Sequence, residues 1–154
     1  MKMANYVQFI HEKNASSCLL KQALGHTDNT YKKINIGDTI YISTNILGKR
    51  VIFGELKVLK KFITSKLDLF WDEDPNKPYK HRVYGILTKY DIPIEVNDEM
   101  KTYTPEGKPL TDAVILRGGY TIPLTSETAA LISKLAIENR LKKLEHVEEL
   151  EEVN

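Results

Sequence analysis

The sequence predicts one α+β domain in which a small, bent β-barrel is flanked by helices. Three observations lead to this class. The chain has 154 residues, which suits one compact domain with a single core. Several short stretches rich in β-branched and aromatic residues follow one another along the middle of the chain. Helical patterns lie near the two ends, and many short strands with two such helices are typical of a small barrel.

The first quarter of the chain predicts a strand followed by a helix. Residues Tyr6 to Ile10 form the strand. Asn14 is a suitable N-cap, and Gly25 is a suitable end for the helix. Apolar residues recur between them at helical spacing, at Cys18, Leu19, Ala23 and Leu24. A polar loop is expected from His26 to Asn29.

The middle of the chain predicts most of the sheet. Asn35 to Asp38 reads as a turn, and the loop at Asn45 to Lys49 predicts a hairpin. Gly54 lies inside a long strand and indicates a bulge or a close backbone approach. Pro93 marks an edge or a bulge. The expected strands cover residues 39–44, 50–62, 81–89 and 92–96, with a long loop at 65–78.

The last third predicts short extended pieces and then a long helix. The pieces cover residues 113–116 and 120–124, around Arg117-Gly118-Gly119. Thr125 or Ser126 caps the helix, and Glu127 lies in its first turn. Its apolar stripe consists of Leu131, Leu135, Leu141, Leu144, Val147 and Leu150. We expect the domain to cover residues 1–139. Residues 140–154 are expected to form an acidic helical extension that serves as a linker or a partner-binding helix, and the alternative is a frayed, charged terminus.

The charges are divided unevenly between the body and the tail. The net charge is +1, but residues 138–154 hold six of the 21 acids and three of the 22 bases. The tail therefore carries −3 and the body +4. A mildly basic body is compatible with a nucleic-acid ligand, and equally with ordinary surface lysines. No apolar stretch is long enough to span a bilayer, and the single cysteine, Cys18, excludes an internal disulfide. These features predict a cytoplasmic protein without a signal peptide.

Catalysis has one weak candidate. Asp38 is followed one hairpin later by Glu55 and Lys57, an order in which some nucleases hold a divalent metal. The ordinary alternative is a Glu/Lys pair on a solvated strand face. The four histidines lack metal-ligand spacing, and the acids at residues 72–74 have no spaced histidine beside them. The sequence therefore predicts a protein that is not an enzyme and that uses no cofactor or metal.

Binding has better candidates on the predicted loops. Phe70 and Trp71, the only tryptophan, lie in a polar, charged loop. Aromatic rings on loops stack against flipped or single-stranded bases, although they also seal barrel ends. Arg117 precedes Gly118-Gly119, where the backbone can approach a ligand and the guanidinium can hold a phosphate. The alternative for this segment is a simple turn with a solvated arginine.

Motifs along most of the chain resemble the PUA-like superfamily, specifically its EVE and YTH branches. The similar segments are residues 5–10, 23–27, 36–41, 51–56, 69–71, 79–83, 107–110 and 117–124. Each is short, so the resemblance lies in their order and spacing. It implies a bent β-barrel with packed helices that flips a modified base, such as N6-methyladenine, into an aromatic-lined pocket. EVE-like domains also form the DNA-reading part of some McrB-type restriction motors.

The resemblance also implies site residues. Trp71 and Phe70 correspond to the wall of the aromatic cage, and His26 and Thr27 to the segment facing the pocket. His11 and Asn14 correspond to contacts with the base edge, and Arg117, Gly118 and Tyr120 to the segment that contacts the backbone. The chain departs from the family where Leu24-Gly25-His26 replaces a cage tryptophan, so either the cage is incomplete or Tyr31 or Tyr120 supplies the second ring. The implied partners are nucleic acid, with modified DNA favoured over RNA, and an NTPase motor reached through the C-terminal helix. RNA binding without modified-base specificity is the alternative.

Overall fold

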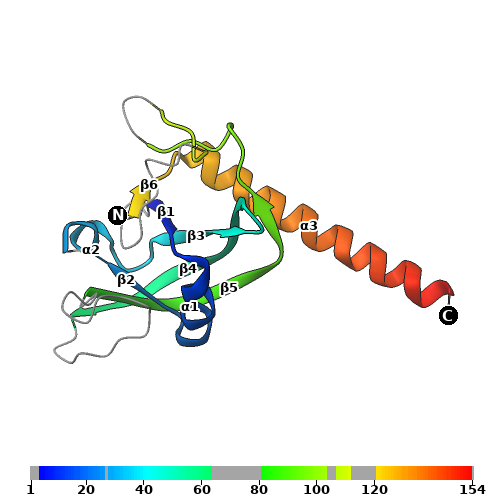
Figure 1. The fold of residues 1–154 in the computed structure, drawn as a ribbon, viewed down its shortest axis with the longest axis horizontal. Coiled ribbons are helices and arrows are strands. Elements are labelled where there is room, and N and C mark those ends of the chain that lie inside the picture. Colours follow the sequence, from blue (N-terminus) through cyan, green and yellow to red (C-terminus); the bar gives the residue numbers. More distant parts are fainter. Residues whose placement is uncertain (1–3, 27, 64–80, 104–106, 112–120, 154) are drawn as a thin grey trace.

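The computed structural model describes residues 4–26, 28–63, 81–103, 107–111 and 121–153. They form one mixed sheet that curls into a half-barrel, with a long helix at the C-terminal end (Figure 1). The strands are β1 (Asn5–Phe9), β2 (Ala23–His26), β3 (Thr39–Ile46), β4 (Lys49–Ile63), β5 (His81–Glu95) and β6 (Thr121–Pro123). The helices are the 3-10 turn η1 (Glu12–Asn14), α1 (Ala15–Lys21), α2 (Asp28–Lys33) and α3 (Ser126–Val153).

The strand order explains how the sheet curls. The order is β2-β5-β4-β3-β1-β6; β1 and β3 are parallel, and the other pairs are antiparallel. β2 is one edge, and β1 lies next to the other edge. Nevertheless, the Gln8 side-chain amide on β1 donates a hydrogen bond to the Gly25 carbonyl on β2, at 3.0 Å. The two ends of the sheet are therefore brought together, which confirms the α+β class with a curled half-barrel.

Two apolar clusters pack on the two sides of this sheet. The inner cluster fills the curl beneath α1 and includes Tyr6, Ile10, Cys18, Leu24, Ile34, Ile40, Ile42, Leu56, Val58 and Val83. The outer cluster lies under α3 and includes Val7, Tyr41, Ile52, Tyr90, Ile94, Met100, Leu110, Leu124 and Ile132. Alternate residues of β1 and β3 enter the two clusters, as the two-residue repeat of a strand requires. Both sides of the central strands are therefore apolar.

The predicted hairpin and bulge are both confirmed. Leu47 and Gly48 connect β3 to β4 with φ angles of 51° and 77°, which is the two-residue geometry that fits the twist of a hairpin. The pairing of β4 with β3 and β5 shifts register beside Gly54. A Cβ atom at Gly54 would lie 2.7 Å from the Thr88 carbonyl oxygen. A larger residue at position 54 would therefore push β5 away.

The prediction for the first helix is wrong in its extent. α1 ends at Lys21, and Gln22 adopts a left-handed conformation with φ 49°. Ala23 and Leu24 then belong to β2, and Gly25 lies within that strand instead of ending the helix. Asn14 makes no side-chain capping bond. The polar loop expected after Gly25 was also wrong, because α2 begins at Asp28.

The two strands expected around Pro93 form one strand, β5. Ile94 pairs with Ile52 and Lys89 with Gly54, so residues 90–93 have no partner on β4. Pro93 lies in this unpaired stretch, where the missing N–H costs no ladder hydrogen bond. The proline therefore marks an irregularity within a strand, not its end.

The C-terminal helix begins as predicted and extends beyond the sheet. The Thr125 hydroxyl accepts a hydrogen bond from the Thr128 N–H at 3.1 Å, which makes Thr125 the N-cap. The first half of α3 covers the outer cluster, and the second half projects away from the sheet (Figure 1). Leu141 and Leu144 are 54% and 53% exposed there. Within the described residues, no helix has the length and apolar character that crossing a membrane requires.

Candidate functional site

Buried polar side chains gather inside the curl, near the end of β1. Gln8 is fully buried, and its amide nitrogen is bonded to the Gly25 carbonyl. Its Oε1 atom is also buried and has no hydrogen-bond partner among the described residues. A buried amide oxygen without a partner costs about 1–3 kcal/mol, so such atoms are rare unless a ligand or water uses them.

Thr44 on β3 lies on the same side of the sheet as Gln8. Ile42 is the Cα partner of Gln8, and Thr44 follows it by two residues, so both point into the curl. Thr44 is 2% exposed, and within the described part of the chain its Oγ1 atom has no hydrogen-bond partner. Two buried polar residues therefore face the same side of the sheet on adjacent strands, offset by two positions along β3.

The segment after β1 adds a third polar residue. Ile10 donates its backbone N–H to the Ser43 carbonyl at 2.8 Å, and η1 then packs against β3. Asn14 lies at the end of η1 and is 8% exposed. His11 is exposed and caps η1, because its Nδ1 accepts from the Lys13 N–H at 3.4 Å. We call Gln8, Asn14, Thr44 and the Gly25 carbonyl the inner polar site.

The structure describes only some of the predicted site residues. Asn14 lies in the inner polar site, and His26 follows Gly25 at the end of β2. Tyr31 packs on the inner cluster, with its ring centroid 5.1 Å from that of His81. Other predicted residues lie outside the described part of the chain, namely Thr27, Phe70, Trp71, Arg117, Gly118 and Tyr120.

Sequence reasoning missed Gln8 and Thr44. Gln8 is the one polar residue in the apolar run from Tyr6 to Ile10, which is a detectable signal. Thr44 gives no such signal, because a β-branched threonine is ordinary in a strand. The spacing of apolar residues up to Leu24 predicted a helix, so the hydrogen bond between Gly25 and Gln8 of β1 could not be anticipated from the sequence.

The structure does not bring together the three residues of the nuclease alternative, Asp38, Glu55 and Lys57. Asp38 is 2% exposed, and its two carboxylate oxygens accept the backbone N–H groups of Ala4 at 3.0 Å and Asn35 at 2.8 Å. Asp38 also pairs through its backbone with Val58 of the inner cluster. Glu55 and Lys57 alternate with inner residues of β4 and therefore point to the other side of the sheet. No group of His, Cys, Asp and Glu suited to a metal ion occurs in the described ranges.

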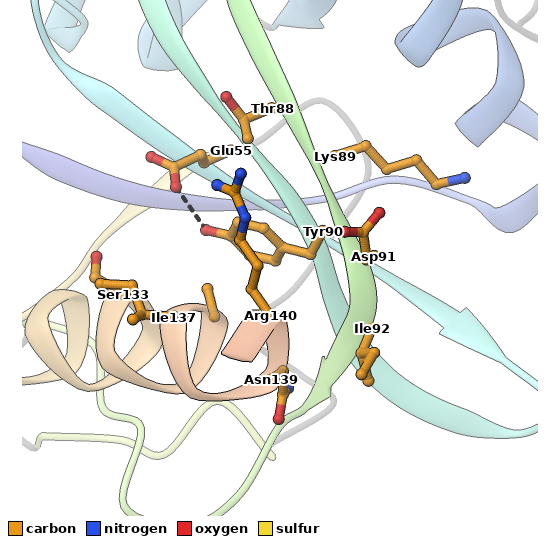
Figure 2. Close-up of a pocket in the computed structure, with 11 residues that line it drawn as sticks. Glu55, Thr88, Lys89, Tyr90, Asp91, Ile92, Ser133, Ile137, Asn139 and Arg140 are labelled. Atoms are coloured by element: carbon orange, nitrogen blue, oxygen red, sulfur yellow. Dashed lines mark hydrogen bonds between the residues drawn. The ribbon is translucent and has the colours of Figure 1, made fainter. Parts of the chain in front are cut away.

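Glu55 instead lines a pocket between the β4–β5 side and α3 (Figure 2). The pocket has a volume of about 390 Å³. The Tyr90 hydroxyl donates to Glu55 Oε1 at 2.9 Å. Burial and, secondarily, the Glu55 charge raise the pKa of Tyr90. Charged residues of both signs line the pocket, including Glu55, Lys89, Asp91 and Arg140.

The hydroxyl groups near this pocket are used to hold α3. Tyr41 lies 3.2 Å from the Ser133 Oγ atom, and its hydroxyl donates to the Ala129 carbonyl at 3.5 Å. Burial is the first cause of the raised pKa of Tyr41, and Glu55 adds to it. Ser133 therefore contacts a phenol and not a general base, so this arrangement offers no activated nucleophile. The inner polar site is the better candidate for ligand binding.

Comparison with solved structures supports the fold. No protein-family model matches the sequence, and no curated protein matches it. A hypothetical protein from Leishmania major has a TM-score of 0.57 at 13% identity, covering 90% of this chain and 98% of its own. The Pho92 YTH domain in complex with m6A has a TM-score of 0.56 at 17% identity, covering 86% and 82%. Human THYN1 in complex with 5-methylcytosine containing DNA has a TM-score of 0.53 at 14% identity, covering 86% and 97%.

These similarities define the class of fold. The chain is similar in architecture to YTH domains and THYN1, which is consistent with a PUA-like α+β fold. A second YTH domain, from Zygosaccharomyces rouxii MRB1, was solved with N6-methyladenosine RNA and has a TM-score of 0.53 at 14% identity. It covers 88% of this chain and 90% of its own. Three of these similar structures were solved in complex with a methylated ligand, namely m6A, N6-methyladenosine RNA and 5-methylcytosine containing DNA.

Proposed function

We propose that this protein binds nucleic acid and recognises a modified base at the inner polar site. The observation that carries the proposal is the buried Oε1 atom of Gln8, which has no partner in the described part of the chain. An amide oxygen accepts an N–H group, and the methylated amino group of N6-methyladenine retains one. The fold supports the proposal, because similar structures contain m6A or 5-methylcytosine DNA.

The predicted loop residues complete the proposed mechanism. A flipped base enters the curl, its edge meets Gln8 and Thr44, and the Trp71 ring stacks on its face. Flipping costs a few kcal/mol, which stacking and edge contacts offset. Arg117 holds the backbone. The protein has no catalytic role in this scheme, and it acts as the specificity module of a restriction system on modified DNA, linked through α3 to an NTPase motor.

The replacement of Thr44 by valine tests the site. Valine has a similar shape but lacks the hydroxyl whose oxygen has no described partner, so Thr44→Val leaves stability unchanged or raises it by about 1 kcal/mol. If the hydroxyl contacts the modified base, affinity for modified DNA falls about two- to tenfold, the value of one hydrogen bond of ~0.5–1.5 kcal/mol. Fluorescence anisotropy with methylated and plain DNA and RNA of one sequence measures both the loss and the preferred nucleic acid.

Ser43 provides the matched control on the same strand. Its hydroxyl donates to the Val51 carbonyl at 2.9 Å, on the opposite side of β3 from Thr44. Ser43→Ala should lower stability by roughly 1 kcal/mol and leave the preference for modified DNA unchanged. Equal affinity of Thr44→Val and wild type for modified DNA would remove Thr44 from the site. An absence of preference for any modified oligonucleotide would refute the function.

A further inference from the structure

A stacked pair of aromatic rings lies on the paired strands β4 and β5, near the last residues of β4 and the first residues of β5, and close to a lysine. The rings of Phe62 and Tyr84 have centroids 4.8 Å apart and planes inclined by 14°. Lys60 is the Cα partner of Tyr84, and its ammonium lies 5.6 Å from the Phe62 centroid. Val83 is buried in the inner cluster, and Tyr84 is partly buried and packs against the same cluster.

Exposed apolar and basic groups continue this surface along the two strands. Leu59 and Ile86 are 53% and 56% exposed, and Lys57 and Lys60 are exposed. Lys57 is the Cα partner of Ile86. We call Lys57, Lys60, Phe62, Tyr84 and Ile86 the ring strip. In Figure 1 it lies toward the end of the ribbon that is farthest from the C-terminal end of α3.

The charge of the paired segments is of one sign. Residues 57–63 contain three lysines and residues 81–88 contain one arginine, and neither segment contains an acid. Lys61 is used inside the protein, because it lies 4.4 Å from the Tyr31 ring centroid and donates to the Ile34 carbonyl. Lys57 and Lys60 are the exposed cations of the strip. A polyanion is therefore the complementary ligand.

We propose that the ring strip binds a single-stranded segment of nucleic acid that flanks the recognised base. This inference rests on the proposed function. Aromatic faces stack on any base, and lysines beside them neutralise the phosphates, which is how non-specific single-strand sites are built. A double helix would keep its bases stacked internally and would offer the rings no base face.

The strip lies close enough to the inner polar site to serve the same strand. Gly25, whose carbonyl belongs to the inner polar site, is the Cα partner of Arg82, and Arg82 is the partner of Phe62. Of the two strands that carry the strip, β5 is therefore next to Gly25 and β4 is the second strand from it. This corresponds to a distance on the order of 5–10 Å across the sheet. Nucleotides next to the flipped base can reach this distance.

Charge and rings together favour nucleic acid over the other complementary occupant, the acidic tail of a second copy. That tail carries exposed Leu141 and Leu144, which could contact Leu59 and Ile86. An acidic, amphipathic helix of this kind could contact the aliphatic residues and the lysines, but its contacts would not require a flat, stacked pair of aromatic rings. Dimerisation is therefore an outcome of the test.

The experiment compares Lys60→Glu and Phe62→Leu with wild type, using unmodified single-stranded and duplex oligonucleotides in fluorescence anisotropy. Lys142→Glu is the charge control, because Lys142 is exposed on α3. Lys60→Glu should weaken single-strand binding about tenfold and lower the salt slope by about 0.7, the effect of one phosphate contact. Phe62→Leu should weaken single-strand binding about fivefold or more and leave duplex binding unchanged. Circular dichroism checks folding.

The outcomes distinguish this inference from the function on which it rests. The variants of the strip should weaken modified and plain single strands alike and preserve the preference for the modified base. Single-strand binding equal to wild type in Lys60→Glu and Phe62→Leu, with that preference intact, overturns the strip alone. Absence of any modified-base preference overturns the proposed function instead. A wild-type dimer in sedimentation that Lys60→Glu dissociates, with unchanged oligonucleotide binding, shows that the strip binds a second copy.

Discussion

Asp38 should be a major source of stability, because its buried carboxylate joins two segments of backbone. Its oxygens accept the N–H groups of Ala4, just before β1, and of Asn35, in the turn before β3. Each hydrogen bond to a charged group contributes about 1.5–3 kcal/mol. Taking the lower value for both, Asp38→Ala should lower the free energy of unfolding by about 3 kcal/mol. For a domain of this length, that loss lowers the Tm by roughly 6–12 °C.

Urea unfolding followed by circular dichroism measures this loss, with Asp91→Ala as the control. Asp91 lies 3.4 Å from the Lys143 ammonium, but both side chains are about half exposed, so its removal should cost less than about 1 kcal/mol. Equal effects of the two variants would contradict the structural role of Asp38. A Tm that rises with Mg²⁺ in wild type but not in Asp38→Ala would instead show that this carboxylate binds metal.

Three further predictions concern the binding loops, the β4–β5 contact and the buried thiol. Trp71→Ala should weaken the binding of modified oligonucleotide far more than that of plain oligonucleotide, and an equal loss of affinity for the two would exclude the cage role of Trp71. Arg117→Ala should weaken the binding of both oligonucleotides alike and flatten its salt dependence. Gly85→Ala should cost at least ~3 kcal/mol in urea unfolding, because the new Cβ would lie 1.8 Å from the Lys57 carbonyl oxygen; a loss below 1 kcal/mol would contradict the close approach. Burial raises the pKa of the Cys18 thiol from 9.0 to about 12, so the unfolded chain releases this proton first and stability falls as pH rises from about 9 to 12. Cys18→Ala removes this contribution. The difference in unfolding free energy between wild type and Cys18→Ala should therefore become smaller as pH rises across that range. A constant difference would contradict the raised pKa of Cys18.

Local signals predicted the local elements of this fold well. The turn before Asp38, the bulge at Gly54 and the cap at Thr125 each depend on a few adjacent residues, and the structure contains all three. The hairpin at Leu47-Gly48 was expected from its glycine. Such features follow from backbone conformations that few residue types allow.

Features that depend on long-range pairing were not predictable from the same signals. Cys18, Leu19, Ala23 and Leu24 fit a helix, yet Ala23 and Leu24 pair with β5 residues about 60 positions away. Strand pairing there replaces the helix because Gln22 reverses the chain in a left-handed conformation. Periodicity cannot distinguish a short apolar strand from the end of a helix.

The residues of the candidate site also differ in whether local sequence signals predict them. The resemblance identified segments, and two of them, around Asn14 and His26, lie beside the inner polar site. Gln8 and Thr44 were missed because their importance arises only when the sheet curls and buries them. The function of Trp71 and Arg117 stays a prediction, since both lie outside the described residues.

Gln8 connects the fold to the proposed function. Its amide nitrogen holds the two ends of the curled sheet together through Gly25, and its amide oxygen remains available inside the curl. A ligand that bonds to this oxygen fixes the orientation of the same amide, and so strengthens the link between β1 and β2. Binding at the inner polar site should therefore protect the β2 amides from hydrogen exchange. Unchanged exchange of residues 23–26 on saturation with modified oligonucleotide would place the ligand elsewhere.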